Sequence, residues 1–210
     1  FDMKYDGKKA QWISLAFRML GLKSNKAEEL AKANIIVKAI RIEENGTMKE
    51  SSSLPTITFK ELVNEKWEDS TLYQYFDEKK FLFVIYKKID GKFSLRGSQI
   101  WNMPHQDILK AKEGWLKIQK IIKEGVLLTP YFLENGSTEI KNNFPPKSSN
   151  EVIHIRPHAS KSYYDLKDGR IYGAGTIIDS DELPDGRRMT KQSFWLNNTY
   201  LLSQIKSELK

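Results

Sequence analysis

Two adjacent acids and a lysine near the beginning of the chain have the residue types of a metal-dependent nuclease site. Glu28 and Glu29 precede an alternating stretch, residues 35–42, that carries Lys38. Carboxylates can hold a divalent cation that activates water and balances charge at phosphorus, and a nearby lysine stabilises developing charge. Because residues two apart on a strand face the same way, an acid at position 36 would lie beside Lys38. That position holds Ile36, which has no oxygen to offer a metal.

Three interpretations of this stretch stay open from the residue types alone. It is a working nuclease site that takes a further acid, such as Asp69 or Asp77. It is a disabled site. Or the two acids lie on a solvated helix or turn before an ordinary amphipathic strand.

A second candidate, residues 152–164, gathers basic and aromatic side chains around a proline: His154, Arg156, Pro157, His158, Lys161, Tyr163 and Tyr164. An arginine at the end of a strand, stiffened by proline, can enter a groove and bind guanine through two hydrogen bonds. The tyrosines could stack on bases or contact phosphate. The alternative is an ordinary strand end with an ion-paired arginine. A zinc site of His154, His158 and His105 would lack its remaining ligand.

A third candidate lies within residues 186–200, where cations precede an expected helix that Thr190 or Ser193 caps. Backbone amides at a helix N-terminus favour phosphate, and nearby cations add to this. The alternative is a solvated loop before a core helix, with Phe194 in the core and Trp195 at its edge. The residues concerned are Arg187, Arg188, Lys191, Gln192 and Trp195, and a weaker pair, Lys8 and Lys9, precedes the first helix.

Composition limits the function classes. The chain has 210 residues, of which 40% are hydrophobic, so it can bury a core. The net charge of +7 favours a polyanionic partner, and because no like-charged block occurs, any basic surface must be assembled by folding. The absence of cysteine excludes disulfides and thiolate chemistry and is compatible with a reducing cytoplasm. Because the sequence begins with Phe1 and not Met, we expect a fragment or domain of a longer protein.

Hydrophobic periodicity and turn residues predict one α+β domain over residues 1–210. In chain order we expect a helix over 10–20, strands over 35–42 and 54–59, a helix over 60–77, strands over 81–87 and 93–101, a helix over 104–124, a loop over 134–150, a strand over 152–156, a loop over 179–188 and a final helix from Thr190 or Ser193. The run 81–87 is apolar enough to be buried on both faces.

Taken together, these stretches resemble the MutH/Sau-type endonuclease family, DNA enzymes that recognise GATC. The most specific stretches are IRPHASKSYYD, LPDGRRMTKQSFWLNNTYLLSQI and GSQIWNMP. The resemblance implies a restriction-endonuclease-like, MutH-like fold, with a mixed central sheet flanked by helices. It also implies that the chain is the C-terminal half of a Sau-type type II enzyme, in which two MutH-like domains occur and the first one cuts.

The resemblance implies a degenerate catalytic site. Active members place an Asp before a Glu-x-Lys on a strand; here Lys38 matches the lysine, Ile36 stands at the second acid and Glu29 at the first. An acid of the first helix has no counterpart in residues 15–17, Leu-Ala-Phe. We therefore expect no metal in this domain, and Mg²⁺ in the catalytic domain of the parent enzyme.

At the positions that the family uses to contact DNA, this sequence has matching residues. Arg156, Pro157 and His158 match the family's Arg-Pro-Lys/His loop, Phe194 and Trp195 its base-sensing aromatic, and Lys8 and Lys9 its lysine-rich loop. The expected partners are GATC duplex DNA, the catalytic domain of the same chain and a dimer on DNA, with no membrane. This domain would be the effector or specificity domain. The alternatives are an active Mg²⁺-dependent endonuclease and a dimerisation module without DNA contacts.

Overall fold

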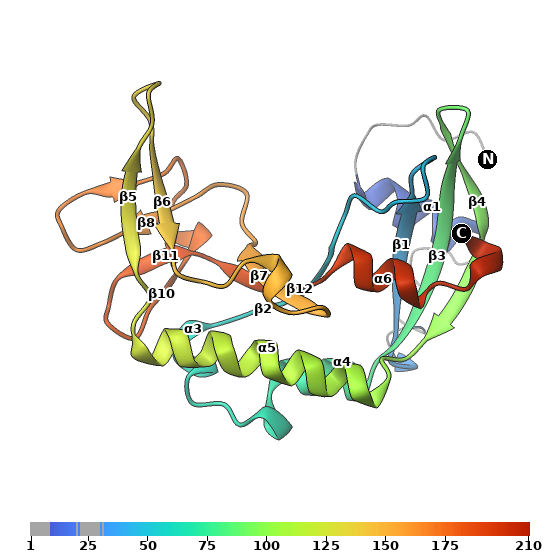
Figure 1. Cartoon of the computed structure of the whole chain (residues 1–210), viewed down its shortest axis with the longest axis horizontal. Coiled ribbons are helices and arrows are strands. Elements are labelled where there is room, and N and C mark those ends of the chain that lie inside the picture. The colour runs from blue at the N-terminus through green and yellow to red at the C-terminus, as the bar shows by residue number, and fades with distance from the viewer. Residues whose placement is uncertain (1–8, 20, 22–29, 31) are drawn as a thin grey trace. The chain divides into compact units, whose positions relative to one another are not determined.

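The computed structural model describes residues 9–19, 21, 30 and 32–210 (Figure 1). Contacts divide the chain into two compact units. Unit 1 comprises Phe1–Glu50, Tyr75–Met103 and Asn198–Lys210, and unit 2 comprises Ser51–Gln74 and Pro104–Asn197. The assignment of the whole chain to a single domain stays a prediction.

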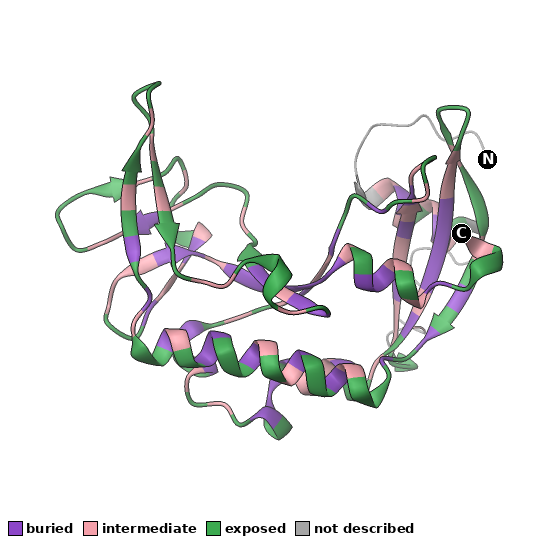
Figure 2. Ribbon diagram, viewed as in Figure 1, coloured by how far each residue is buried: buried purple, intermediate pink, exposed green. Residues whose placement is uncertain are grey.

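A three-stranded mixed sheet forms the centre of unit 1, in the order β1-β3-β4. Strand β1 (Ile35–Ile42) runs parallel to β3 (Lys80–Ile89), and β4 (Lys92–Trp101) pairs antiparallel with β3. Asp90 and Gly91 both have positive φ, 49° and 77°, as a tight hairpin turn requires. The three strands predicted here are confirmed, and β3 is buried at Phe81 and over residues 83–86 (Figure 2).

Helices cover both faces of this sheet. In α1 (Lys9–Met19), Trp12 and Ala16 pack against a core that includes Val84 and Tyr86 of β3. Strand alternation turns Phe83 to the opposite face, where it stacks on Trp101 at 5.2 Å between ring centroids. The ring of Tyr200, in α6 (Asn198–Gln204), lies 6.2 Å from that of Trp101.

The long helix α5 (His105–Glu124) organises the core of unit 2. Its buried face is the predicted one, formed by Ile108, Ala111, Trp115, Ile118 and Ile122. Buried Gln119 also lies on this helix and donates hydrogen bonds to the carbonyls of Leu62 and Glu65, at 2.8 and 2.9 Å.

The single helix predicted over residues 60–77 is wrong. The segment forms α3 (Phe59–Leu62), a 3₁₀ turn η2 (Trp67–Asp69) and α4 (Thr71–Asp77). The break is stabilised by Ser70, whose hydroxyl donates to the Trp67 carbonyl and accepts the Tyr73 amide. A serine side chain that bonds the local backbone competes with helix propagation and then caps the next helix.

Unit 2 contains a sheet that is antiparallel throughout, with the strand order β2-β12-β7. It consists of β2 (Ser52–Thr56), β12 (Gln192–Leu196) and β7 (Ile153–Pro157). The final helix predicted from Thr190 or Ser193 is therefore wrong over 192–196, where every residue is buried in the central strand. Its aromatic residues favour a strand placed between two neighbours, and helix α6 begins only at Asn198.

The remaining elements of unit 2 are short. They are the hairpin β5 (Leu128–Phe132) and β6 (Thr138–Asn142), the sheet of β10 (Ser180–Glu182), β11 (Arg188–Thr190), β8 (Tyr164–Asp165) and β9 (Ile171–Tyr172), and the 3₁₀ turns η3 (Lys147–Ser149) and η4 (Ile177–Asp179). The loops predicted over 134–150 and 179–188 thus contain strands. A further turn in unit 1, η5 (Ser207–Leu209), follows α6.

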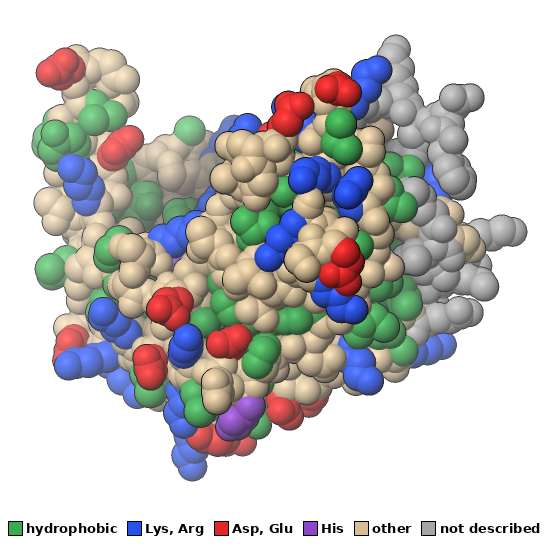
Figure 3. All heavy atoms as spheres, turned by 45° about the vertical axis from the view of Figure 1, so that its right-hand side comes forward, with side chains coloured by type: hydrophobic (Ala, Val, Ile, Leu, Met, Phe, Trp, Pro, Cys, Tyr) green, Lys and Arg blue, Asp and Glu red, His purple; other side chains and the backbone are tan. Residues whose placement is uncertain are grey.

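The predicted α+β class is confirmed, with small sheets flanked by helices, an arrangement compatible with a restriction-endonuclease-like fold. On the face drawn in Figure 3, Lys and Arg side chains lie in small groups among acids and form no single block of one sign. Within the described residues, no helix combines the length and the apolar character needed to cross a membrane.

Candidate nucleic-acid interface

Arg156 lies at the exposed end of strand β7 and stacks on a tryptophan of the next strand. The carbon of its guanidinium is 4.3 Å from the centroid of the Trp195 ring. In the β7–β12 register Arg156 pairs with Ser193 and His154 with Trp195, so all four side chains share one face of the sheet. Pro157 ends the strand at the sheet edge, where its missing N–H costs no ladder bond.

His158 extends this face beyond the strand. Its amide donates to the carbonyl of Lys191 at 2.8 Å, and its Nδ1 shares a 2.7 Å hydrogen bond with Ser193 Oγ. The imidazole lies edge-on to Trp195, with 5.3 Å between ring centroids. Ser193 Oγ also donates to Thr56 Oγ1 at 3.3 Å, which ties the histidine to strand β2. We call Arg156, His158, Ser193 and Trp195 the Arg156 cluster.

The indole of Trp195 is only 9% exposed, and its Nε1 has no hydrogen-bond partner within the described part of the chain. Because the ring is buried, it has little freedom to move beneath the guanidinium. A planar, always-charged fork in this position can meet the two acceptors of a guanine edge or a phosphate. Its cation–π contact is worth on the order of 0.5–2 kcal/mol.

His154 has a structural role in the same sheet. Its Nδ1 is hydrogen-bonded to Oδ1 of buried Asn197 at 2.6 Å. Burial lowers the pKa of His154, the Asn197 hydrogen bond opposes that shift, and the charges of Lys147 and Arg156 lower the pKa further. The net direction is downward, so the neutral imidazole is favoured in the folded protein.

This lowered pKa predicts that stability decreases in mild acid. The unfolded chain binds a proton at His154 near pH 6.5, before the folded chain does, so stability is lost as pH falls through about 6.5 toward the folded pKa. We expect His154→Gln to reduce the difference in unfolding free energy between about pH 7.5 and 5.5, measured by urea titration. The matched control is His105→Gln, at an exposed position. Equal pH dependence in His154→Gln and the wild type would contradict this account.

The other residues of unit 2 that were predicted to contact DNA differ in how accessible their side chains are to a ligand. Lys161 is exposed and Lys191 half-buried, whereas Gln192 is buried and donates to the Thr190 carbonyl at 2.9 Å. Arg187 forms an ion pair with Asp185 at 2.6 Å and donates to the Val126 carbonyl at 2.6 Å. Arg188 donates to Ser180 Oγ at 3.0 Å and lies 3.5 Å from Glu182.

The side chains of Gln192, Arg187 and Arg188 are thus engaged within the protein. A strand and not a helix begins directly after Lys191, so the expected helix N-terminal amides are not there. Of the two tyrosines, Tyr164 is buried and Tyr163 half-buried. The structure thus gathers Arg156, Pro157, His158, Lys191 and Trp195, and it places Arg187 and Arg188 in ion pairs of their own.

The positions that the family resemblance matches to a catalytic site lie in unit 1. Ile36 and Lys38 are half-buried on β1, in register with Phe81 and Phe83 of β3, so apolar rings share their face. Ala16, in the stretch that lacks the helical acid, is fully buried. Glu28, Glu29 and Lys8 lie outside the described residues, as does the side chain of Lys9.

The sheet that carries Lys38 and the two helices that cover it hold no acid among their described residues. None of the described strands β1, β3 and β4 or helices α1 and α6 contains Asp or Glu, and all but α6 contain Lys or Arg. Across the part of the chain that the structure describes, no three His, Asp or Glu side chains converge as metal ligands would. Asp69 and Asp77 lie at the ends of η2 and α4 and are exposed.

Sequence reasoning missed three residues that hold the Arg156 cluster. Ser193 was expected to cap a helix, and Thr56 and Asn197 had no assigned role. Asn197 donates to the carbonyls of Asn150 and Glu151 at 2.7 and 2.9 Å and also binds His154. No local signal marks these residues, because their roles follow from strand pairing between segments far apart in the sequence.

Comparison with known proteins gives one informative similarity. The chain is 36% identical over 198 residues to the type II restriction enzyme Sau3AI of Staphylococcus aureus. The similarity covers 87% of this chain, which spans 40% of the length of that enzyme. No family model matches. This similarity indicates that the chain is related to part of a type II restriction enzyme, a class of enzyme that acts on DNA.

Proposed function

We propose that this chain binds duplex DNA containing GATC without cutting it and acts as the effector or specificity domain of a type II restriction enzyme. The observation that carries the proposal is the exposed guanidinium of Arg156, fixed 4.3 Å above the buried ring of Trp195. The similarity to Sau3AI gives DNA as the class of ligand. The GATC preference rests on the matched Arg156-Pro157-His158 stretch.

The Arg156 cluster supports base recognition more than simple charge attraction. Ser193 and Trp195 hold His158 and Arg156 in place before DNA binds, so little side-chain entropy is lost on binding. Arginine bonds guanine O6 and N7 with two parallel donors, and it discriminates between bases by roughly 1–3 kcal/mol. Exposed Lys161 and half-buried Lys191 would supply sequence-independent phosphate contacts beside it.

The degeneracy of the matched catalytic positions supports binding without cutting. Two of the three acids expected from the family pattern are missing, and among the described elements β1, β3, β4, α1 and α6 contain no acid that could replace them. Without the two missing acids a divalent ion has too few oxygen ligands. Their absence also removes repulsion against DNA phosphates, so this domain needs no metal to bind. We assign Mg²⁺ and strand cleavage to a separate catalytic domain of a longer enzyme.

A mobility-shift titration in EDTA tests this function. The wild-type chain is expected to shift a labelled GATC duplex at lower protein concentration than a scrambled duplex of equal length. Binding should weaken steeply as salt rises, because each neutralised phosphate releases counterions. Failure to bind any duplex at low salt, with a dimer detected by light scattering, would replace this proposal with a dimerisation module.

A further inference from the structure

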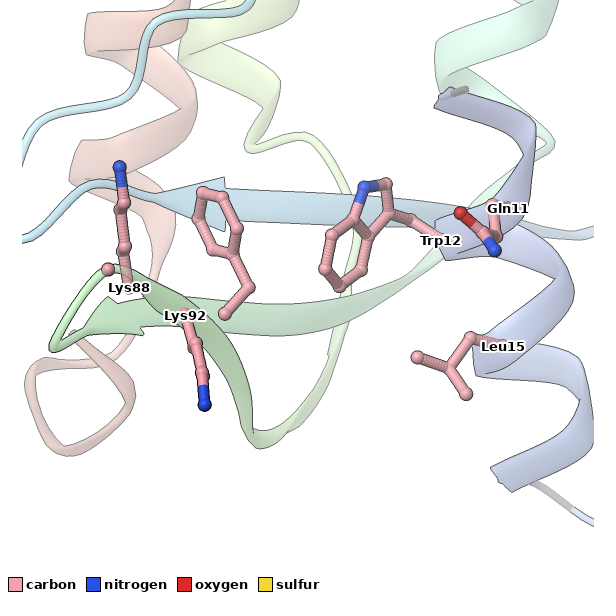
Figure 4. Close-up of a pocket in the computed structure, with 7 residues that line it drawn as sticks. Gln11, Trp12, Leu15, Lys88 and Lys92 are labelled. Carbon is pink, nitrogen blue, oxygen red and sulfur yellow. The ribbon is translucent and has the colours of Figure 1, made fainter. Parts of the chain in front are cut away.

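Unit 1 contains a pocket that shares no residue with the Arg156 cluster and shares only Leu15 with the stretches matched to a catalytic site. It lies between helix α1 and the hairpin of β3 and β4 (Figure 4) and has a volume of about 500 Å³. Pockets of this size hold small organic ligands. The lining is Gln11, Trp12, Leu15, Lys88, Gly91, Lys92 and Phe93.

Aromatic side chains form one wall of the pocket. The rings of Trp12 and Phe93 meet edge to face with centroids 5.4 Å apart, and Trp12 also contacts Tyr86 at 4.9 Å. The guanidinium of Arg41 lies 5.9 and 5.8 Å from the Trp12 and Phe93 centroids. These contacts fix the wall, and a planar apolar ring could lie against it at low entropic cost.

The charged lining of the pocket is positive. Lys88 and Lys92 both line it, and no acid does among the described residues. Lys88 is partly neutralised by Glu43 at 3.7 Å. Lys92 is exposed and has no ion-pair partner within the described residues, and its ammonium points away from that of Lys88 in Figure 4. Lys92 is therefore the cation best placed to meet an anionic group of a ligand.

We infer that this pocket binds one nucleotide unit, with its base against Trp12 and Phe93, its sugar near Leu15 and its phosphate at Lys92. A flat ring joined to a phosphate matches an aromatic wall beside an unneutralised lysine. Base–aromatic stacking tolerates any base, since each has a π face. The unit could be a free nucleoside monophosphate or a nucleotide of an unpaired DNA strand. The inference is independent of the proposed function, because every lining residue belongs to unit 1.

Calorimetric titrations separate these two sources. One arm uses the four deoxynucleoside monophosphates, and the other uses a single-stranded tetranucleotide with a 5′-phosphate, which is too short to form a stable duplex. Saturable one-to-one binding of the monophosphates would assign the site to a free nucleotide. Binding of the tetranucleotide alone would assign it to a strand end.

Two variants locate the binding. Lys92→Gln should weaken ligand binding about tenfold, because one hydrogen bond to a charged group is lost. The control Lys123→Gln, at an exposed position of α5, should leave ligand binding unchanged. Leu15→Trp should fill the pocket and abolish binding with all charges retained. Thermal melting checks that both variants fold. If Leu15→Trp does not fold, the binding measured with Lys92→Gln decides the test. No binding in either arm, or unchanged binding by Lys92→Gln, would overturn the inference.

Discussion

Replacing Arg156 with alanine is expected to weaken binding to GATC duplex by about 10- to 100-fold and to abolish most of the preference over scrambled DNA. The reason is that one arginine paired with a guanine edge supplies roughly 1–3 kcal/mol of base discrimination. The effect on folding should be small, because the guanidinium is exposed and contacts the protein through the Trp195 ring. Parallel titrations of both duplexes in EDTA measure the change.

Arg156→Lys is the matched control, because it keeps the charge but loses the planar fork and its stacking on Trp195. It should bind scrambled DNA nearly as the wild type does while losing the GATC preference. If Arg156→Ala weakened both duplexes equally, Arg156 would be a phosphate contact and not a base reader.

Replacing Asn197 with alanine is expected to have the largest effect on stability, about 3 kcal/mol, since three side-chain hydrogen bonds are lost and buried partners are left unpaired. Asn197 is 3% exposed and joins the end of β12 to the residues before β7 through Asn150 and Glu151. It also holds His154. Urea unfolding with a probe of unit 2 measures the loss.

The consequence should extend to DNA binding, because Asn197 fixes how β7 lies against β12 and therefore how Arg156 meets Trp195. Asn143→Ala is the control, since exposed Asn143 accepts one hydrogen bond, from the Leu127 amide at 2.9 Å. It should cost about 1 kcal/mol or less. Similar losses for the two variants would show that the Asn197 bonds do not hold the sheet.

The sequence predicts elements well where one periodicity dominates. The unbroken apolar run of β3 requires burial on both faces, and it forms the centre of its sheet. The face of α5 follows from residues spaced three and four apart. Strand β1 follows from alternation alone, and its bounds match the predicted ones.

Prediction fails where partners far along the chain decide the structure. Residues 192–196 join a helical apolar pattern that continues to Leu209, and only pairing with β2 and β7 makes them a strand. The turn at Glu134–Gly136, which connects β5 to β6, falls inside the loop predicted over 134–150. The surrounding Asn, Ser and Pro residues are typical of a loop, and the two strands show little of the apolar alternation that would predict a hairpin.

The candidate site shows the same limit. The place of Arg156 at an exposed strand end followed from the local sequence, because Pro157 ends the strand. The burial of Gln192 and the ion pairs of Arg187 and Arg188 did not, since their partners come from tertiary packing. Residue type therefore indicated which side chains could bind DNA, and packing decided which were available.

Binding without cutting is tested most directly by one titration of labelled GATC duplex with this chain in Mg²⁺, with each sample run on native and denaturing gels. We predict a shifted band whose strands remain intact at every protein concentration. Cleaved strands that disappear when Lys38 is replaced by alanine would contradict the account, because they would require a working metal site around a residue whose neighbouring strands carry no carboxylate.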